Sequence, residues 1–259
     1  MKAYLINLDK DAQRLAFFKK NFDRLGIPFE RISAVDGRTF SEADYQAFMQ
    51  TRPRNYNRAA GKPWLRGQMG CFLSHYNVWK KIAEGRENFC AVFEDDVHTS
   101  DDLKHVLQSD IWIPPNTDVI RLETSTNRIK LSSQPTLSFR KRNLYKVKST
   151  SWCAGAYIIS RKAAQRLVAL SEKYHEPADV MLYHFEESVI AKDLCILQFN
   201  PALCTQDKHL AEGKVKFSSN IEFDNAQAPN VSRIFKRYSP ANVLTAAYRS
   251  LSGYKRITF

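Results

Sequence analysis

The chain has 259 residues, of which 44% are hydrophobic and 12% aromatic, and its 39 Lys and Arg against 27 Asp and Glu give a formal charge of +12. This composition excludes disordered and collagen-like chains, and the length suffices for one large α/β domain or two small ones. The five cysteines are an odd number without a C-x-x-C pair. They argue against a disulfide framework and a zinc site and predict reduced, mostly buried thiols.

The positive charge is concentrated in three segments. Residues 52–66, 121–150 and 231–259 carry net charges of +5, +7 and +6, so the rest of the chain is mildly acidic. Segments of this kind predict binding to an anionic partner. Nucleic acid, an acidic lipid surface and a phosphorylated substrate all satisfy that condition.

The elements in chain order indicate a parallel α/β sheet. A buried strand at residues 3–8 is followed by an amphipathic helix at 9–25, which Gly26 ends, and by a second strand at 28–32. Further strands are predicted at 89–93, 119–122, 156–159 and 195–199, and further helices at 68–83 and 161–174. Strands alternating with helices to about residue 200 predict one doubly wound domain followed by a basic tail.

Membrane insertion is not expected from the hydropathy of the chain. The apolar stretch at residues 3–8 is too short for a signal peptide or an anchor. No window approaches the roughly 18 apolar residues that a spanning helix requires. We therefore expect a cytoplasmic protein.

An acidic cluster, VFEDDV at residues 92–97, follows a buried strand directly. Ligands of parallel α/β sheets bind at the carboxyl ends of the strands. In an extended segment Glu94 and Asp96 project to one side and Asp95 to the other. Such a pair can hold Mg²⁺ or Mn²⁺, which keeps coordination positions open for phosphates. On spacing alone, a solvated acidic loop that caps the next helix is an equally good interpretation.

Six sequence blocks resemble, in order, the bacterial lipooligosaccharide glycosyltransferases of family 25, chiefly galactosyltransferases. They are YLINLDKDAQR (4–14), GCFLSHYNVW (70–79), VFEDDV (92–97), GAYIISRKAA (155–164), PADVML (177–182) and NPALCTQ (200–206). The resemblance implies a GT-A-type α/β fold, with a mostly parallel Rossmann-like sheet and helices on both faces. It also implies a divalent metal and inverting transfer of a hexose, galactose from UDP-galactose first and UDP-glucose or a UDP-N-acetylhexosamine as alternatives.

The resemblance also implies the chemical roles at the site. The acidic triplet becomes the equivalent of an Asp-x-Asp motif, with Asp96 as the chief metal ligand and Glu94 or Asp95 at the ribose or at a metal-bound water. Asp179 becomes the candidate general base or acceptor contact, although a carboxylate at a helix start needs no catalytic role. Glu186 and Glu187 are the reserve bases. His209 is the candidate for a late metal or diphosphate ligand, although a lone surface histidine is the commoner interpretation of such a residue.

Donor and acceptor contacts are expected from several elements. The donor should contact the ends of the first two strands, the first helix, the 68–83 helix, the acidic cluster and the strand after it. The residues expected to make these contacts are Asn7, Leu8, Asp9, Arg14, Ala34, Asp36, Gly37, Ser74, His75, Glu94, Asp95, Arg121 and Glu123. Arg14 is equally readable as a solvated residue, and a buried histidine bonded to backbone is the commoner reading of His75. The acceptor is expected at Trp152 and Gln206.

The domain prediction places a catalytic domain at residues 1–230, with a nucleotide-binding half at about 1–100 and an acceptor-binding half at about 101–230. The tail at 231–259 has the apolar stripe and flanking cations of an interfacial helix, or equally of an amphipathic helix packed on the domain. The predicted partners are a UDP-sugar donor, a lipooligosaccharide acceptor and the anionic inner face of the bacterial inner membrane, where the protein would bind peripherally.

Three other function classes fit less well. A nucleic-acid-binding protein would explain the charge but not the acidic strand end, and no such motif is visible, so no nucleic acid is expected. A glycoside hydrolase needs two opposed carboxylates and no nucleotide. A phosphoryl or nucleotidyl transferase ordinarily shows a Gly-rich phosphate-binding loop, which the sequence lacks.

Overall fold

Eight strands form the central sheet of the computed structural model, which describes residues 1–50, 65–210, 217 and 252–259. Their order across the sheet is β2 (Glu30–Ser33), β1 (Lys2–Asn7), β3 (Phe89–Glu94), β10 (Ala156–Ser160), β5 (Val119–Arg121), β11 (Ile196–Asn200), β9 (Arg142–Lys146) and β8 (Leu137–Phe139). β1 pairs in parallel with β2 and β3, and β5 with β11. β10 runs antiparallel to both of its neighbours, and β9 runs antiparallel to β11 and β8.

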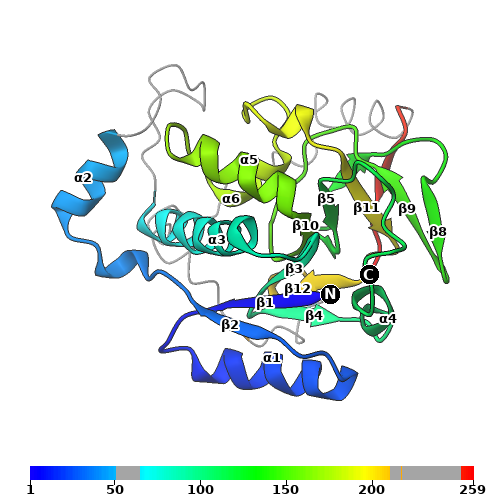
Figure 1. Cartoon of the computed structure of the whole chain (residues 1–259), viewed down its shortest axis with the longest axis horizontal. Coiled ribbons are helices and arrows are strands. Elements are labelled where there is room, and N and C mark those ends of the chain that lie inside the picture. The colour runs from blue at the N-terminus through cyan, green and yellow to red at the C-terminus, as the bar shows by residue number, and fades with distance from the viewer. Residues whose placement is uncertain (51–64, 211–216, 218–251) are drawn as a thin grey trace, which may run out of the picture.

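Side chains of the buried strands alternate between two apolar layers. On one face, Tyr4 and Ile6 of β1 pack in a cluster with α3 (Arg66–Glu84), α5 (Arg161–Ser171) and α6 (Ala178–Tyr183). On the other face, Ala3 and Leu5 pack with α1 (Ala12–Leu25) and α4 (Leu103–Leu107). The two helix layers lie on opposite sides of the sheet in Figure 1. The predicted α/β class, with helices on both faces of a mostly parallel sheet, is confirmed.

Two small sheets lie beside the central one. β4 (Val97–Thr99), β12 (Cys204–Gln206) and β6 (Glu123–Thr124) form the first, and β7 (Arg128–Lys130) with β13 (Tyr254–Arg256) forms the second. The remaining elements are η1 (Gly37–Thr39), α2 (Glu42–Gln50), η2 (Ala191–Asp193) and η3 (Asp207–His209). Because β12 pairs with β4, which directly follows the acidic cluster, it brings Gln206 to the end of β3.

Most predicted elements are present within a few residues of their expected bounds. Gly26 ends α1 in the left-handed conformation, with φ of 66°. The short strands β6 to β9 and helix α2 were not predicted, because they are brief, polar and paired only through the tertiary fold. All five cysteines are free thiols, although only Cys90 and Cys204 are fully buried.

Part of the predicted basic segments lies outside the described residues. This applies to residues 52–64 and to residues 231–251, which include the apolar stripe of the expected tail. Residues 254–256 form β13, and the adjoining Ile257 is 3% exposed, so the described end of that segment packs on the domain. Within the described ranges, no helix combines the length and apolarity needed to cross a membrane.

Candidate active site

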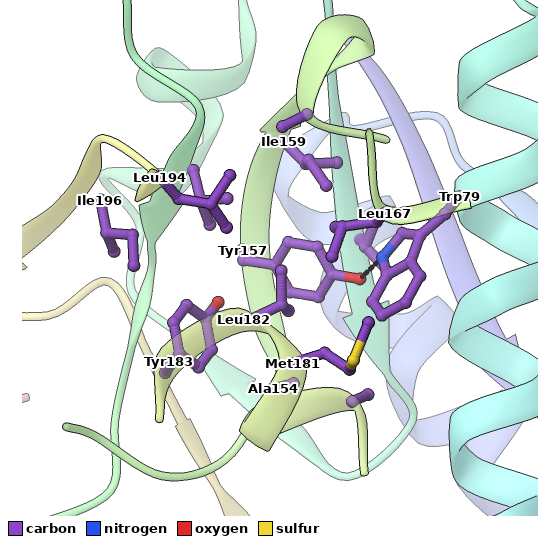
Figure 2. Close-up of a cluster of buried hydrophobic side chains, with 14 of the residues drawn as sticks. Trp79, Ala154, Tyr157, Ile159, Leu167, Met181, Leu182, Tyr183, Leu194 and Ile196 are labelled. Carbon is purple, nitrogen blue, oxygen red and sulfur yellow. Dashed lines mark hydrogen bonds between the residues drawn. The ribbon is translucent and has the colours of Figure 1, made fainter. Parts of the chain in front are cut away.

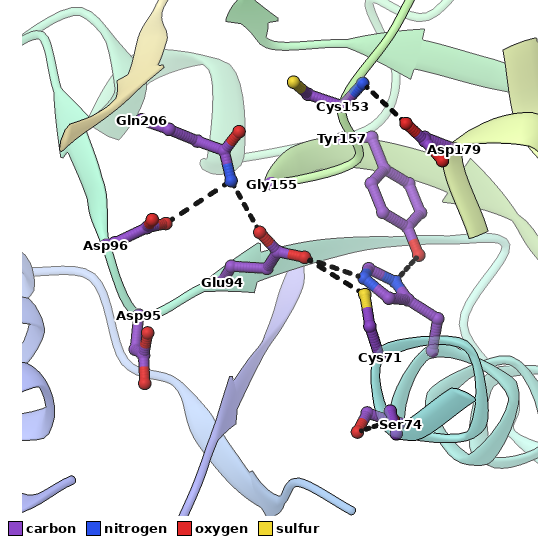
Figure 3. A network of polar contacts seen from close by, with 12 residues as sticks. Cys71, Ser74, Glu94, Asp95, Asp96, Cys153, Gly155, Tyr157, Asp179 and Gln206 are labelled. Carbon is purple, nitrogen blue, oxygen red and sulfur yellow. Dashed lines mark hydrogen bonds and ion pairs between the residues drawn. The ribbon is translucent and has the colours of Figure 1, made fainter. Parts of the chain in front are cut away.

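The acidic cluster lies at the carboxyl end of β3, and its side chains divide as the strand periodicity predicts (Figure 3). Gln206 Nε2 donates to Glu94 Oε2 at 2.6 Å and to Asp96 Oδ1 at 3.4 Å, so these two carboxylates face the same side. Asp95 points the other way, where it accepts from Asn7 Nδ2 at 2.7 Å and from Arg14 Nη1 at 2.8 Å. Both Asp95 oxygens therefore already have partners within the chain.

The three carboxylates differ in their protonation. Burial raises the pKa of Asp96 to about 7, and the neighbouring Glu94 charge adds to the rise. Burial also raises the pKa of Asp95, although Asn7 and Arg14 oppose it. For Glu94, burial would raise the pKa, but the hydrogen bond with His75 and the positive charges of Lys208 and Arg14 oppose it, and the pKa is lowered. Crowded acidic groups of this kind favour a cation between Glu94 and Asp96.

The residues present fit a hard divalent cation. The Gln206 amide NH₂ lies between Glu94 and Asp96, where positive charge is favoured. Its Oε1 atom is buried and has no hydrogen-bond partner within the part of the chain that the structure describes. Rotation of the amide would bring that oxygen towards the two carboxylates. Carboxylate and amide oxygens are the ligands that Mg²⁺ and Mn²⁺ prefer. Glu94, Asp96 and Gln206 are therefore the candidate ligands, whereas Asp95 is held by Asn7 and Arg14.

A buried hydrogen-bond chain orients Glu94 from behind. Trp79 Nε1 donates to the Tyr157 hydroxyl at 2.8 Å (Figure 2), which lies 2.9 Å from His75 Nδ1, and His75 Nε2 lies 3.2 Å from Glu94 Oε1. With the indole N–H on the Tyr157 oxygen, the hydroxyl proton is available to His75 Nδ1, which leaves Nε2–H for Glu94. His75 is fully buried. His75 is thus buried, as the commoner interpretation expected, but the partners of its ring are the side chains of Tyr157 and Glu94 instead of backbone, so that it positions a carboxylate.

Cys71 joins the same group, which the cysteine spacing did not indicate. Its Sγ lies 3.8 Å from Glu94 Oε1, and the ligand atoms of Cys71, His75 and Glu94 lie within 4.8 Å of one another. Burial raises the pKa of the Cys71 thiol well above its ordinary range, and the charge of Glu94 adds to the rise. The thiol is therefore protonated at neutral pH.

A cavity of about 150 Å³ extends from the acidic cluster over the end of β1. Ten of the predicted donor or metal residues line it: Asn7, Leu8, Arg14, Ala34, Asp36, Gly37, Ser74, Glu94, Asp95 and Asp96. Two glycines let the start of α3 approach the 34–37 turn, since a Cβ on Gly37 would lie 1.7 Å from Arg66 O and one on Gly70 2.5 Å from Val35 O. Ser74 Oγ accepts the Val35 N–H at 2.9 Å and holds this contact.

A second cavity, of about 200 Å³, adjoins the first and shares Cys71, Glu94, Gln206 and Lys208 with it. Asp179, at the start of α6, faces this second cavity. Its Oδ2 accepts the Cys153 N–H at 3.1 Å and its Oδ1 accepts the Val180 N–H at 2.9 Å. Each carboxylate oxygen retains a further lone pair for a ligand. Asp179 and the acidic cluster thus border two adjoining cavities.

Arg121 and Glu123 have a different placement from the predicted contact with the sugar. Each is 1% exposed. Arg121 donates to Gln198 and to the Ser151–Cys153 loop, and its guanidinium lies 4.3 Å from the Tyr183 ring centroid. Glu123 Oε1 accepts the Gly155 N–H at 2.6 Å, and burial raises the Glu123 pKa to about 8. Both residues hold the loop that leads into β10, and neither lines the two cavities.

Five other predicted residues, like His75, are also not among those that line the two cavities. Asp9 is exposed and pairs with Arg31 and Ser33. Glu186 is bonded to Thr150 and lines a separate depression, and Glu187 lies 3.8 Å from His184 Nε2. His209 Nε2 lies 3.6 Å from Cys153 Sγ. Trp152, the predicted acceptor contact, is 41% exposed on the same loop and lines the Glu186 depression.

Lys208 is the cation that the sequence reasoning missed. It lines both cavities. Burial would lower its pKa, but Cys153, Glu94 and Asp96 outweigh burial and raise it, so the ammonium stays charged. Its position two residues after Gln206 was the available signal, because β12 delivers this segment to the acidic cluster.

Sequences similar to this chain are found among known glycosyltransferases. Residues 1–182 match the model of a family described as glycosyltransferase family 25 (LPS biosynthesis protein). The lacto-N-neotetraose biosynthesis glycosyltransferase LgtB of Neisseria meningitidis serogroup B is 31% identical, over 93% of this chain and 88% of its own length. The lipooligosaccharide biosynthesis protein lic2B of Haemophilus influenzae is 26% identical, over 98% of this chain and 97% of its own. Among solved structures, an active-site mutant of LgtC has a TM-score of 0.42 at 14% identity, over 90% and 99% of the two chains.

Proposed function

The chain belongs to glycosyltransferase family 25, and on that premise we propose that it transfers a hexose, galactose from UDP-galactose, to a lipooligosaccharide core acceptor with inversion at the anomeric carbon. One observation carries the proposal. The acidic pair Glu94 and Asp96 and the carboxylate of Asp179 border two adjoining cavities. A metal-bound donor and an acceptor hydroxyl can therefore meet between them.

The first cavity suits the donor. We assign the nucleoside to the residues that line the cavity at the ends of β1 and β2, which are Asn7, Leu8, Ala34, Asp36 and Gly37. Arg14 and Lys208 add positive charge beside the carboxylates, where a diphosphate would lie. When bound, Mn²⁺ or Mg²⁺ on Glu94, Asp96 and Gln206 would neutralise charge on the departing UDP.

Asp179 is the proposed general base. Inversion requires a base on the acceptor side, opposite the leaving diphosphate, to take the proton of the attacking hydroxyl. Among the described residues that line the second cavity, Glu94 and Asp179 are the carboxylates, and Glu94 is held by His75 and Gln206. The Cys153 N–H fixes Asp179 Oδ2 at 3.1 Å. The rotamer of the base is thereby set before the acceptor arrives.

The acceptor and cellular setting follow from family and charge. We assign the nucleotide half of the catalytic domain to about residues 1–100 and the acceptor half to about 101–230, although the central sheet is continuous across that boundary. The net charge of +12 suits a phosphorylated acceptor and peripheral binding at the anionic inner face of the bacterial inner membrane, from the cytoplasm. We do not propose nucleic acid as a partner, because acidic side chains, Glu94, Asp95 and Asp96, line the first cavity.

Thermal shift and donor hydrolysis with a panel of sugar nucleotides test the proposal. We expect UDP-galactose with Mn²⁺ to raise Tm and to be hydrolysed slowly, and EDTA to remove both effects. Asp101→Asn is the matched control for Asp96→Asn, because Asp101 is an exposed carboxylate paired with Arg24. A preference for UDP-glucose or UDP-N-acetylglucosamine would overturn the galactose assignment alone. Lack of response to every nucleotide sugar would overturn the transferase mechanism as drawn.

A further inference from the structure

A polar depression of about 340 Å³ lies beside the proposed acceptor cavity. Its lining includes Arg128, Thr150, Trp152, Glu186 and Tyr254. Trp152 is 41% exposed, among the few large apolar side chains of the described residues that face solvent to this extent. An exposed indole surrounded by charged and hydroxyl groups suits a ligand that has both an apolar face and hydrogen-bonding groups.

The depression and the acceptor cavity are joined by one short loop. Trp152 lines the depression, while the next two residues, Cys153 and Ala154, line the cavity that contains Asp179. Adjacent residues joined by a trans peptide bond are about 3.8 Å apart at their Cα atoms, so the depression and the cavity are neighbours. A linear ligand that leaves the Asp179 cavity along this loop reaches the indole next.

The loop is held by buried groups. The fully buried guanidinium of Arg121 donates to Ser151 Oγ at 2.6 Å and to Trp152 O at 2.9 Å. Cys153 has a backbone φ of 72°, which residues other than Gly rarely adopt, and its N–H donates to Asp179. Such a conformation persists only where the surroundings impose it. The structure therefore fixes the backbone on both sides of an indole that itself remains open to solvent.

The contacts of Trp152 and Glu186 leave binding surface free on both. The indole meets the buried His184 ring with centroids 4.8 Å apart in an edge arrangement, so the contact is not a stacked one. Glu186 hydrogen-bonds Thr150 and lies 3.6 Å from His184 Nδ1, yet its side chain is 67% exposed. An indole face and a carboxylate thus border the same depression, and Arg128 adds a cationic donor on its rim.

We propose that this depression binds the second sugar of the acceptor, the residue next to the one that receives the transferred hexose, with Trp152 as its platform. The apolar C–H face of a pyranose would lie on the indole, and its hydroxyls would bond to Glu186, Thr150 and Arg128. The proposal rests on the proposed function, because it presumes that the acceptor enters at Asp179. It assigns Glu186 to acceptor selection instead of the reserve-base role.

Acceptors of two lengths test this subsite. The probes are methyl glycosides of glucose, galactose and N-acetylglucosamine, and β-linked disaccharides with the same sugar at the non-reducing end. For the productive pair, we expect Trp152→Ala to lower kcat/KM for the disaccharide about 10-fold more than for the monosaccharide, through KM. Trp152→Phe should retain most of the disaccharide preference, and Glu186→Gln should lose part of it. Ile111→Ala, at a 92% exposed position outside the described cavities, is the control and should change neither value.

Equal losses for both acceptor lengths, or an unchanged disaccharide preference in Trp152→Ala, would overturn the subsite. Failure of the proposed function is recognised separately, as absence of transfer to every acceptor from every donor. In that case, intrinsic fluorescence titrated with the same saccharides still decides the subsite. A saturable change with disaccharides that Trp152→Phe removes supports it, and no such change overturns it.

Discussion

Replacing Glu123 by Gln distinguishes a buried structural carboxyl from a donor-binding one. Glu123 is 1% exposed, and its Oε2 has no partner among the described residues. Burial raises its pKa to about 8 from an ordinary value of 4.5, with Arg121 opposing the rise and Glu94 adding to it. The side chain is therefore protonated in the folded protein at neutral pH, and an amide replaces it with little change in shape or charge.

The expected effect of Glu123 on the free energy of unfolding follows from proton linkage. Between pH 4.5 and 8 the folded protein holds a proton on Glu123 that the unfolded chain has lost, so the free energy of unfolding falls as pH rises. One such group lowers it by about 1.4 kcal/mol per pH unit, and by about 5 kcal/mol over the whole interval. Because Gln does not titrate, we expect the stability of Glu123→Gln relative to the natural protein to increase by this amount as pH rises.

Urea denaturation at pH 5, 6, 7 and 8 measures this difference. The two proteins should have similar stability near pH 5 and diverge above it, whereas Glu172→Gln, at an exposed helix end, should follow the natural protein throughout. Parallel pH profiles for Glu123→Gln and the natural protein would refute the reasoning. A raised KM for the donor at pH 7, without any change in the pH profile, would instead restore the predicted sugar contact.

Three further substitutions test the site. Asp96→Asn should remove the Mn²⁺-dependent Tm shift and lower kcat at least about 100-fold, since it deletes a proposed metal ligand; full activity in metal-free buffer would contradict this. Asp179→Asn should melt normally and bind donor, yet transfer at least about 100-fold more slowly; normal turnover would exclude it as the base. Lys208→Met should weaken UDP binding about 10-fold by calorimetry, because it removes a cation beside the diphosphate; unchanged affinity would place the diphosphate elsewhere.

Much of the proposed donor site could be predicted from local pattern. An apolar run that ends in EDD specifies a buried strand with carboxylates at its end, and the two-residue period of a strand puts Glu94 and Asp96 on one side and Asp95 on the other. The helical spacing of apolar residues and the stop at Gly26 likewise specify α1. These features depend on a few consecutive residues, so the amino-acid sequence by itself determined them.

Long-range pairing was decided by the tertiary structure alone. Gln206 meets Glu94 across 112 positions of sequence because β12 pairs with β4, and the same pairing delivers Lys208 to the cavities. The resemblance to the family predicts a donor contact for Arg121 and Glu123, yet the sheets around them bury both side chains, which hold the Trp152 loop. Burial and partners at such distances depend on the whole packing arrangement, since no local pattern records which strands will become neighbours.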